Sequence, residues 1–225
     1  EAEEKVLRTF AAMPSGKKHG KTGVTERQEK PKLAVKQKKT DQVHLAFGIR
    51  TCNLYHEDSP ALRVLSSILG GGMSSRLFQK MREELGICYY IGASHESFTD
   101  HGFLEITAGV PAARLPEAVS AIAGEVRRLK SDAVHAEELL RIKEYLAGSL
   151  YLSLESSDAL AEFYGFQEIM RKPLLRPEET IQKIRAVTAA NISRVACAYL
   201  SDAHLNLALI GPVEDKKELE QILHL

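Results

Sequence analysis

Arg82 and Tyr89, seven residues apart, are the two side chains of this sequence whose types and spacing could do chemistry. A guanidinium offers a fixed fork of donors to a peptide carbonyl. A phenol can donate a hydrogen bond to an oxyanion that forms at a bond under attack. Each residue also has a structural interpretation, because a cation suits a helix C-terminus and an aromatic side chain packs well on a strand. The two residues alone leave both interpretations open.

A glycine-led motif precedes this pair. Residues 69–78 read LGGGMSSRLF, and the pattern continues through Arg82, Gly86 and Tyr89. The motif resembles the second-domain signature of the pitrilysin, insulysin and mitochondrial processing peptidase family, which are zinc peptidases with an inverted His-x-x-Glu-His motif. The resemblance covers about the whole chain and is strongest over residues 41–110. It implies that Arg82 and Tyr89 reach across a closed chamber to bind a peptide held at the zinc, and that Tyr89 supports the transition state.

The zinc motif of that family is absent from the sequence. None of the eight histidines lies in His-x-x-Glu-His or His-Glu-x-x-His, and the nearest match, residues 135–139, has Leu139 where the second ligand would be. A catalytic zinc needs about three converging protein ligands. We therefore expect no metal ligand here, and interpret Glu137 and Glu138 as first-turn acids that suit the helix dipole. The resemblance implies that this chain is the C-terminal half, with zinc bound by the missing N-terminal half.

Three further features have competing interpretations. Gly70, Gly71 and Gly72 could suggest a phosphate loop, but no Gly-Lys-Ser or Gly-Lys-Thr follows them. The resemblance implies instead a tight turn near the chamber wall, for which glycine supplies backbone freedom. Arg76 is matched in the family, yet a structural role at the helix start or at a domain interface is favoured over substrate contact. An adventitious metal could bind at the hairpin tip, where the candidate ligands are His95, Glu96, Asp100 and His101.

The composition excludes several classes of protein. The chain has 225 residues, 44% hydrophobic and 27% charged, which suits a packed core and excludes a disordered or fibrous chain. Its 30 basic and 30 acidic residues balance, so no global field directs it to nucleic acid or to an anionic membrane. Nine basic residues lie between Lys17 and Lys39, but without aromatic residues they predict a solvated linker rather than a nucleic-acid surface. No stretch approaches the roughly 18 apolar residues that cross a bilayer.

Hydrophobic periodicity predicts an α+β fold. Strands are expected over residues 42–49, 87–98, 102–110 and 205–210. Helices are expected over residues 1–13, 58–69, 74–85, 111–130, 135–153, 159–170 and 214–223, with two shorter ones within 178–200. Helix 74–85 should carry Arg82 on its last full turn and end at a left-handed Gly86. This order predicts a largely antiparallel sheet with helices covering one face, as in one half of a pitrilysin-type metallohydrolase.

The sequence divides into three expected parts. Residues 1–13 would be the terminal helix of a preceding domain, residues 14–40 a basic linker and edge strand, and residues 41–225 the C-terminal peptidase-family domain. The three cysteines are far apart, so they make neither a disulfide framework nor a metal site, and free thiols are expected. This favours a cytoplasmic location but leaves the compartment open.

We expect the complete protein to be a zinc-dependent endopeptidase that cleaves unstructured peptides, with this chain inactive by itself. The competing interpretation is a non-catalytic structural or partner subunit, like the core subunits of respiratory complexes that share this fold. Arg82 and Tyr89 argue against it, since a structural copy has no need of the pair. The expected partners are a peptide and the N-terminal catalytic half, on the same polypeptide or a separate subunit. An exposed interdomain face would also favour self-association. Substrate and cleavage preference stay open.

Overall fold

The computed structural model describes residues 1–14, 16–17, 20–170, 172–214 and 216–225. Its centre is a five-stranded sheet in the order β1-β5-β2-β4-β3. The strands are β1 (Lys32–Gln37), β2 (Val43–Thr51), β3 (Tyr90–Ser97), β4 (Gly102–Val110) and β5 (Leu205–Gly211). β1 runs parallel to β5, and the other three pairs are antiparallel. The predicted hairpin is β3–β4, and β4 has the predicted boundaries, whereas β3 begins three residues later than predicted.

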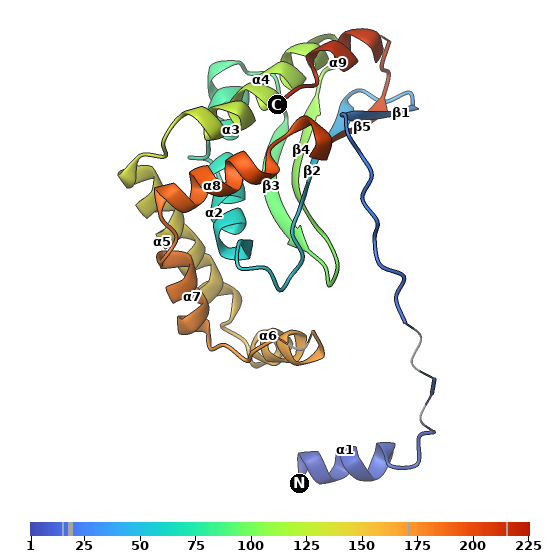
Figure 1. Ribbon diagram of the computed structural model, residues 1–225, viewed down its shortest axis with the longest axis vertical. Coiled ribbons are helices and arrows are strands. Elements are labelled where there is room, and N and C mark those ends of the chain that lie inside the picture. The colour runs from blue at the N-terminus through green and yellow to red at the C-terminus, as the bar shows by residue number, and fades with distance from the viewer. Residues whose placement is uncertain (15, 18–19, 171, 215) are drawn as a thin grey trace.

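Helices lie on one face of this sheet (Figure 1). α2 packs against β3 and against α5, α7 and α8, while α4 packs against α8 and α9. The bounds are α2 (Ser59–Gly70), α3 (Arg76–Phe78), α4 (Leu115–Ser131), α5 (Ala136–Ser153), α6 (Ser157–Ile169), α7 (Pro177–Arg185), α8 (Ala189–Tyr199) and α9 (Lys216–Ile222). Two short 3₁₀ turns, η2 (Ala112–Arg114) and η3 (Asp202–His204), precede α4 and β5. The predicted α+β architecture is therefore confirmed.

The sheet has a buried face and an open face because its strands alternate. In β2, the buried positions are Val43, Leu45, Phe47 and Ile49, whereas the positions between them face outward. α2 meets the buried face with Leu65, Ile68 and Leu69, each fully buried. Burying one such side chain contributes about 1.5–3 kcal/mol, so this apolar layer is the main source of stability. On the open face, the outward-facing residues of paired strands lie next to one another.

The predicted helix over residues 74–85 differs in its geometry. α3 continues directly into a π-helical segment, η1 (Gln79–Glu84), in which the N–H of Leu85 bonds to the carbonyl of Lys80, five residues earlier, at 3.1 Å. Arg82 therefore lies on a π turn, not on a regular α turn. Apolar periodicity predicts a helix here, but it does not distinguish i−4 from i−5 hydrogen bonding. π turns are rare and are frequently found at functional sites.

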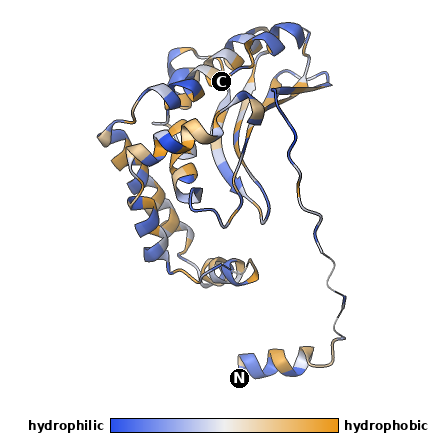
Figure 2. Cartoon of the chain, viewed as in Figure 1, coloured by the Kyte–Doolittle hydropathy of each residue, from blue (hydrophilic) through white to orange (hydrophobic). Residues whose placement is uncertain are grey.

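α1 (Ala2–Phe10) stands apart from the sheet at the far end of the linker (Figure 1). It buries no residue, and Val6, Leu7 and Phe10 are all more than half exposed. Figure 2 shows hydrophobic colour along part of this isolated helix. Its apolar stripe thus packs against nothing in the described part of the chain. None of the described helices combines the length and the apolar character that a membrane-spanning helix needs.

Candidate functional site

Arg82 and Tyr89 lie side by side in the structure. The Arg82 guanidinium donates a hydrogen bond to the backbone carbonyl of Tyr89 and lies 5.6 Å from the centre of the Phe78 ring. Both residues are exposed, and 57% of Tyr89 is accessible to solvent. A fixed cation and an exposed tyrosine thereby lie together directly before the edge strand β3.

The turn between η1 and β3 brings the two residues together. Gly86 has a positive φ of 59°, as predicted, and the N–H of Ile87 bonds to the carbonyl of Met81 at 2.9 Å. This arrangement ends a helix with a left-handed residue and returns the chain along it. The N–H of Tyr89 then donates to the carbonyl of Gly109 at 2.9 Å. Hydrogen bonds on both sides of Tyr89 therefore fix its backbone.

The two neighbouring tyrosines have different environments. The Tyr90 phenol shares a hydrogen bond of 3.0 Å with Nδ1 of His44, and the two rings stack with centroids 6.1 Å apart. In the described part of the chain, the phenol of Tyr89 makes no hydrogen bond. Of the two, Tyr89 is the phenol that is free to meet a ligand.

Each of the three glycines at residues 70–72 is favoured over other residues for a different structural reason. A Cβ on Gly70 would lie 2.2 Å from the backbone nitrogen of Ala93, so only glycine lets the end of α2 approach β3 this closely. A Cβ on Gly71 would lie 2.8 Å from atoms of Ser67. Gly72 has a φ of 119°, which L side chains rarely adopt. After Gly72 the chain turns, because the N–H of Ser75 bonds to the carbonyl of Gly72 at 3.1 Å, and the loop follows helix α2 rather than a strand.

Arg76, in the same motif, has a structural partner. Its Nε and Nη2 donate to the two carboxylate oxygens of Glu138 at 2.8 and 2.7 Å, and both side chains are mostly buried. This hydrogen bonding lowers the pKa of Glu138 and raises the pKa of Arg76. The pair ties the start of α3 to the first turn of α5. This ion pair supports the structural role expected for Arg76, and the Glu138 carboxylate accepts two hydrogen bonds from this arginine.

No metal site is formed by the described residues: no three His, Cys, Asp or Glu side chains converge. At the hairpin tip, burial lowers the pKa of His95 to about 4, and its Nε2 shares a 3.0 Å hydrogen bond with Thr51. Asp100 instead binds Lys21 at 2.5 Å and His101 at 2.8 Å, and these bonds lower its pKa to about 2. The donor set therefore does not fit a catalytic zinc.

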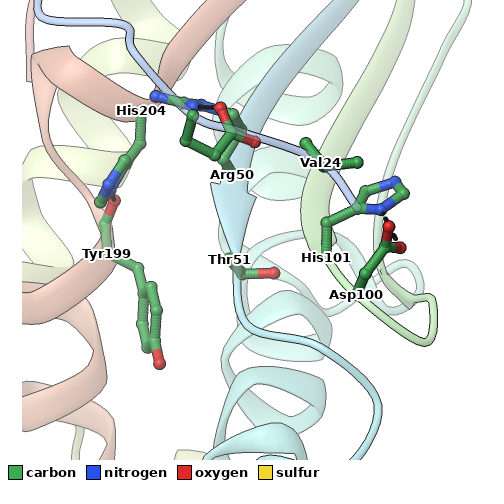
Figure 3. Close-up of a pocket in the computed structure, with 8 residues that line it drawn as sticks. Val24, Arg50, Thr51, Asp100, His101, Tyr199 and His204 are labelled. Atoms are coloured by element: carbon green, nitrogen blue, oxygen red, sulfur yellow. Dashed lines mark hydrogen bonds and ion pairs between the residues drawn. The ribbon is translucent and has the colours of Figure 1, made fainter. Parts of the chain in front are cut away.

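A small hollow of about 140 Å³ lies near the hairpin tip, where the linker crosses the sheet (Figure 3). Glu26 forms an ion pair with Arg50, Lys21 binds Asp100, and Gln28 donates to the carbonyl of Leu205 at 2.7 Å. We call these three contacts the linker clasp. It lies at the other end of the hairpin from Tyr89, because Thr51 pairs with Gly102 whereas Tyr90 pairs with Gly109. The hollow is thus separate from the candidate site.

The family with the description peptidase M16 inactive domain matches residues 1–146, which is more than half of the chain. The chain belongs to this family. The M16 domain is 34% identical over 191 residues to an uncharacterized zinc protease of Bacillus subtilis, YmxG, covering 85% of this chain and 46% of that protein. It is 32% identical to an uncharacterized zinc protease of Mycobacterium tuberculosis, with 86% and 44% covered. The chain thus spans about half the length of these relatives.

Solved structures show the same fold. The M16 inactive domain of Pseudomonas fluorescens superposes with a TM-score of 0.82 at 20% identity, covering 95% of this chain and 51% of the other. A protease of Helicobacter pylori gives 0.81 at 23% identity, with 93% and 51% covered. A chain of the complex III2 structure from Candida albicans gives 0.74 at 14% identity, with 87% and 49% covered. The family match confirms the resemblance found in the sequence motif, and the solved structures agree with it in fold.

Proposed function

We propose that this M16 domain is the substrate-binding half of a zinc-dependent endopeptidase that cleaves unstructured peptides in a closed chamber. The contact between Arg82 and Tyr89 carries the proposal, because it holds the guanidinium against the backbone of an exposed tyrosine. Among the described residues, Arg82 has no acidic partner and the Tyr89 phenol makes no hydrogen bond. The zinc and the attacking water belong, in this proposal, to the part of the protein outside this chain. The zinc-protease names of the relatives support that assignment.

In the proposed reaction, the chain's own residues bind and orient the peptide. Arg82 has further N–H donors beyond the one bound to Tyr89, and these can bind a peptide carbonyl. Tyr89 can donate its phenolic hydrogen to the oxygen that gains charge at the scissile carbon. β3 is an edge strand, so an extended peptide can add to it by main-chain hydrogen bonds. By itself, the chain should hydrolyse no peptide.

The proposal is tested by Tyr89→Phe in the complete protein, assayed with a mixture of internally quenched unstructured peptides. We expect kcat/KM to fall about 10²–10³-fold, the typical cost of losing one transition-state donor, with zinc content unchanged. Tyr151→Phe is the matched control, because Tyr151 is a half-exposed tyrosine on α5. Wild-type turnover by Tyr89→Phe would contradict the proposal. Absence of any cleavage by the complete wild-type protein would favour the structural-subunit interpretation.

A further inference from the structure

Gly109 of β4 lies between two aromatic side chains in one row of the open face. Register places His44 of β2 opposite Gly109 on one side and Tyr90 of β3 opposite it on the other. The 3.0 Å hydrogen bond from Tyr90 to His44 therefore spans the whole width of β4. The two rings bridge three strands over a residue that has no side chain.

Glycine is required under this bridge. A Cβ on Gly109 would lie 2.6 Å from Cε1 and 3.0 Å from Cδ1 of the Tyr90 ring. The ring thus lies directly on the backbone of β4, where any larger residue would displace it. A glycine inside a strand usually marks such a close approach.

The same glycine also holds Tyr89. Its carbonyl accepts the N–H of Tyr89 at 2.9 Å, while its bare α-carbon supports the ring of Tyr90. Two consecutive tyrosines are therefore fixed on one residue, one through its backbone and the other through its side chain. His44 holds Tyr90 on the open face, whereas the Tyr89 phenol makes no hydrogen bond with the described residues.

We propose that His44, Gly109 and Tyr90 are positioning residues, which hold Tyr89 in place for the substrate without touching the substrate themselves. This inference rests on the proposed function of Tyr89. The His44–Tyr90 bond prevents the first residue of β3 from fraying, and the bond from Tyr89 to Gly109 depends on that strand end. Arg82, bound to the Tyr89 carbonyl, is positioned by the same device.

Activity and amide exchange together test the proposal in the complete protein. Tyr90→Phe and His44→Leu each remove the one hydrogen bond between these side chains, so kcat/KM should fall about three- to tenfold. His44→Gln keeps a side-chain amide that can bond to the phenol and should recover part of the loss. In the Tyr89→Phe background, Tyr90→Phe should cause no further loss, because the bridge acts through the Tyr89 phenol. Equal, additive losses in the double variant would show a merely structural role and overturn the proposal.

A second measurement is independent of turnover. Hydrogen exchange of the Tyr89 amide should accelerate about three- to tenfold in Tyr90→Phe and in His44→Leu. The amide of Ile106, in the centre of β4, should exchange as in the wild type. Unchanged exchange at Tyr89 would overturn the positioning proposal whatever the activity. A different outcome would be wild-type turnover by Tyr89→Phe together with faster exchange of the Tyr89 amide in Tyr90→Phe and His44→Leu. This outcome would contradict the function proposed for Tyr89, but it would support the positioning of Tyr89 by the His44–Tyr90 bond.

Discussion

Arg76 and Arg82 lie six residues apart in one motif and have opposite environments. Arg76 is mostly buried and makes a bidentate ion pair with Glu138. Arg82 is exposed, has no acidic partner in the described part of the chain, and donates to a backbone carbonyl. An arginine whose charge is already neutralised holds elements together, whereas one with spare donors can bind a ligand. The comparison separates an ion-paired arginine from an arginine with spare donors within one helical segment.

The largest expected difference is in activity. Arg82→Ala in the complete protein should lower kcat/KM about 10²–10³-fold, because a substrate donor is lost. Its free energy of unfolding should change by less than about 1 kcal/mol, as for other exposed positions. Lys80→Ala is the matched control, since Lys80 is a partly exposed cation on the same segment and pairs with Glu84. Activity near the wild-type level in Arg82→Ala would contradict the proposed binding of substrate by Arg82.

The second effect is on stability. Arg76→Ala leaves the Glu138 carboxylate mostly buried without its partner, and should lower the free energy of unfolding by about 2–3 kcal/mol. Urea titration of the isolated domain measures this change. Arg76→Lys should recover only part of it, because an ammonium cannot match the bidentate geometry. A loss below about 0.5 kcal/mol would show that the pair is no more than a surface contact.

The pH dependence of stability should also distinguish the two arginines. The pKa of Glu138 is lowered in the folded protein, chiefly by the hydrogen bonds from Arg76. This contribution is therefore present above the unfolded pKa of about 4.3 and is lost as the pH falls through the folded value. Urea midpoints measured from about pH 7 to about pH 3 should fall less steeply in Arg76→Ala than in the wild type. Arg82→Ala should follow the wild-type curve.

The smallest effect is expected at the turn that brings Arg82 to Tyr89. Gly86→Ala places a Cβ in open space but forces alanine to adopt a φ of 59°. The strain should cost about 1 kcal/mol of stability. Urea titration should show this loss, and Gly16→Ala, in the linker with open space around it, should show none of it. A Gly86→Ala variant as stable as the wild type would show that the turn relaxes.

Sequence reasoning predicted the elements that depend on local pattern. Alternation gave the boundaries of β4, and the motif brought Arg82, Gly86 and Tyr89 together in the expected turn. The contact of Arg82 and Tyr89 with a substrate stays a prediction. The sequence predicted that Arg82 lies on a helix but not that it lies on a π turn. Hydrophobic periodicity does not show whether each N–H bonds to the carbonyl four or five residues earlier.

Long-range partners could not be predicted. Glu138 lies 62 residues from Arg76, and β1 pairs with β5 about 175 residues further along the chain. His44 and Tyr90 meet only because β2 and β3 flank β4, so the strand order had to be known first. The one signal in the sequence was Gly109, a glycine near the end of a strand pattern, which often marks a close approach.

The linker clasp limits how far α1 can travel from the sheet. Lys21 is bound at the hairpin tip and Phe10 ends α1, so ten residues lie between them and the chain makes eleven Cα–Cα steps from one to the other. A chain of that length reaches at most about 40 Å when fully extended. A domain that packs on the apolar stripe of α1 would therefore be held close to this sheet. Its effective concentration there would be on the order of millimolar, whatever the concentration of the protein in the cell. Because the linker is short, association of such a domain with the sheet would be an intramolecular event.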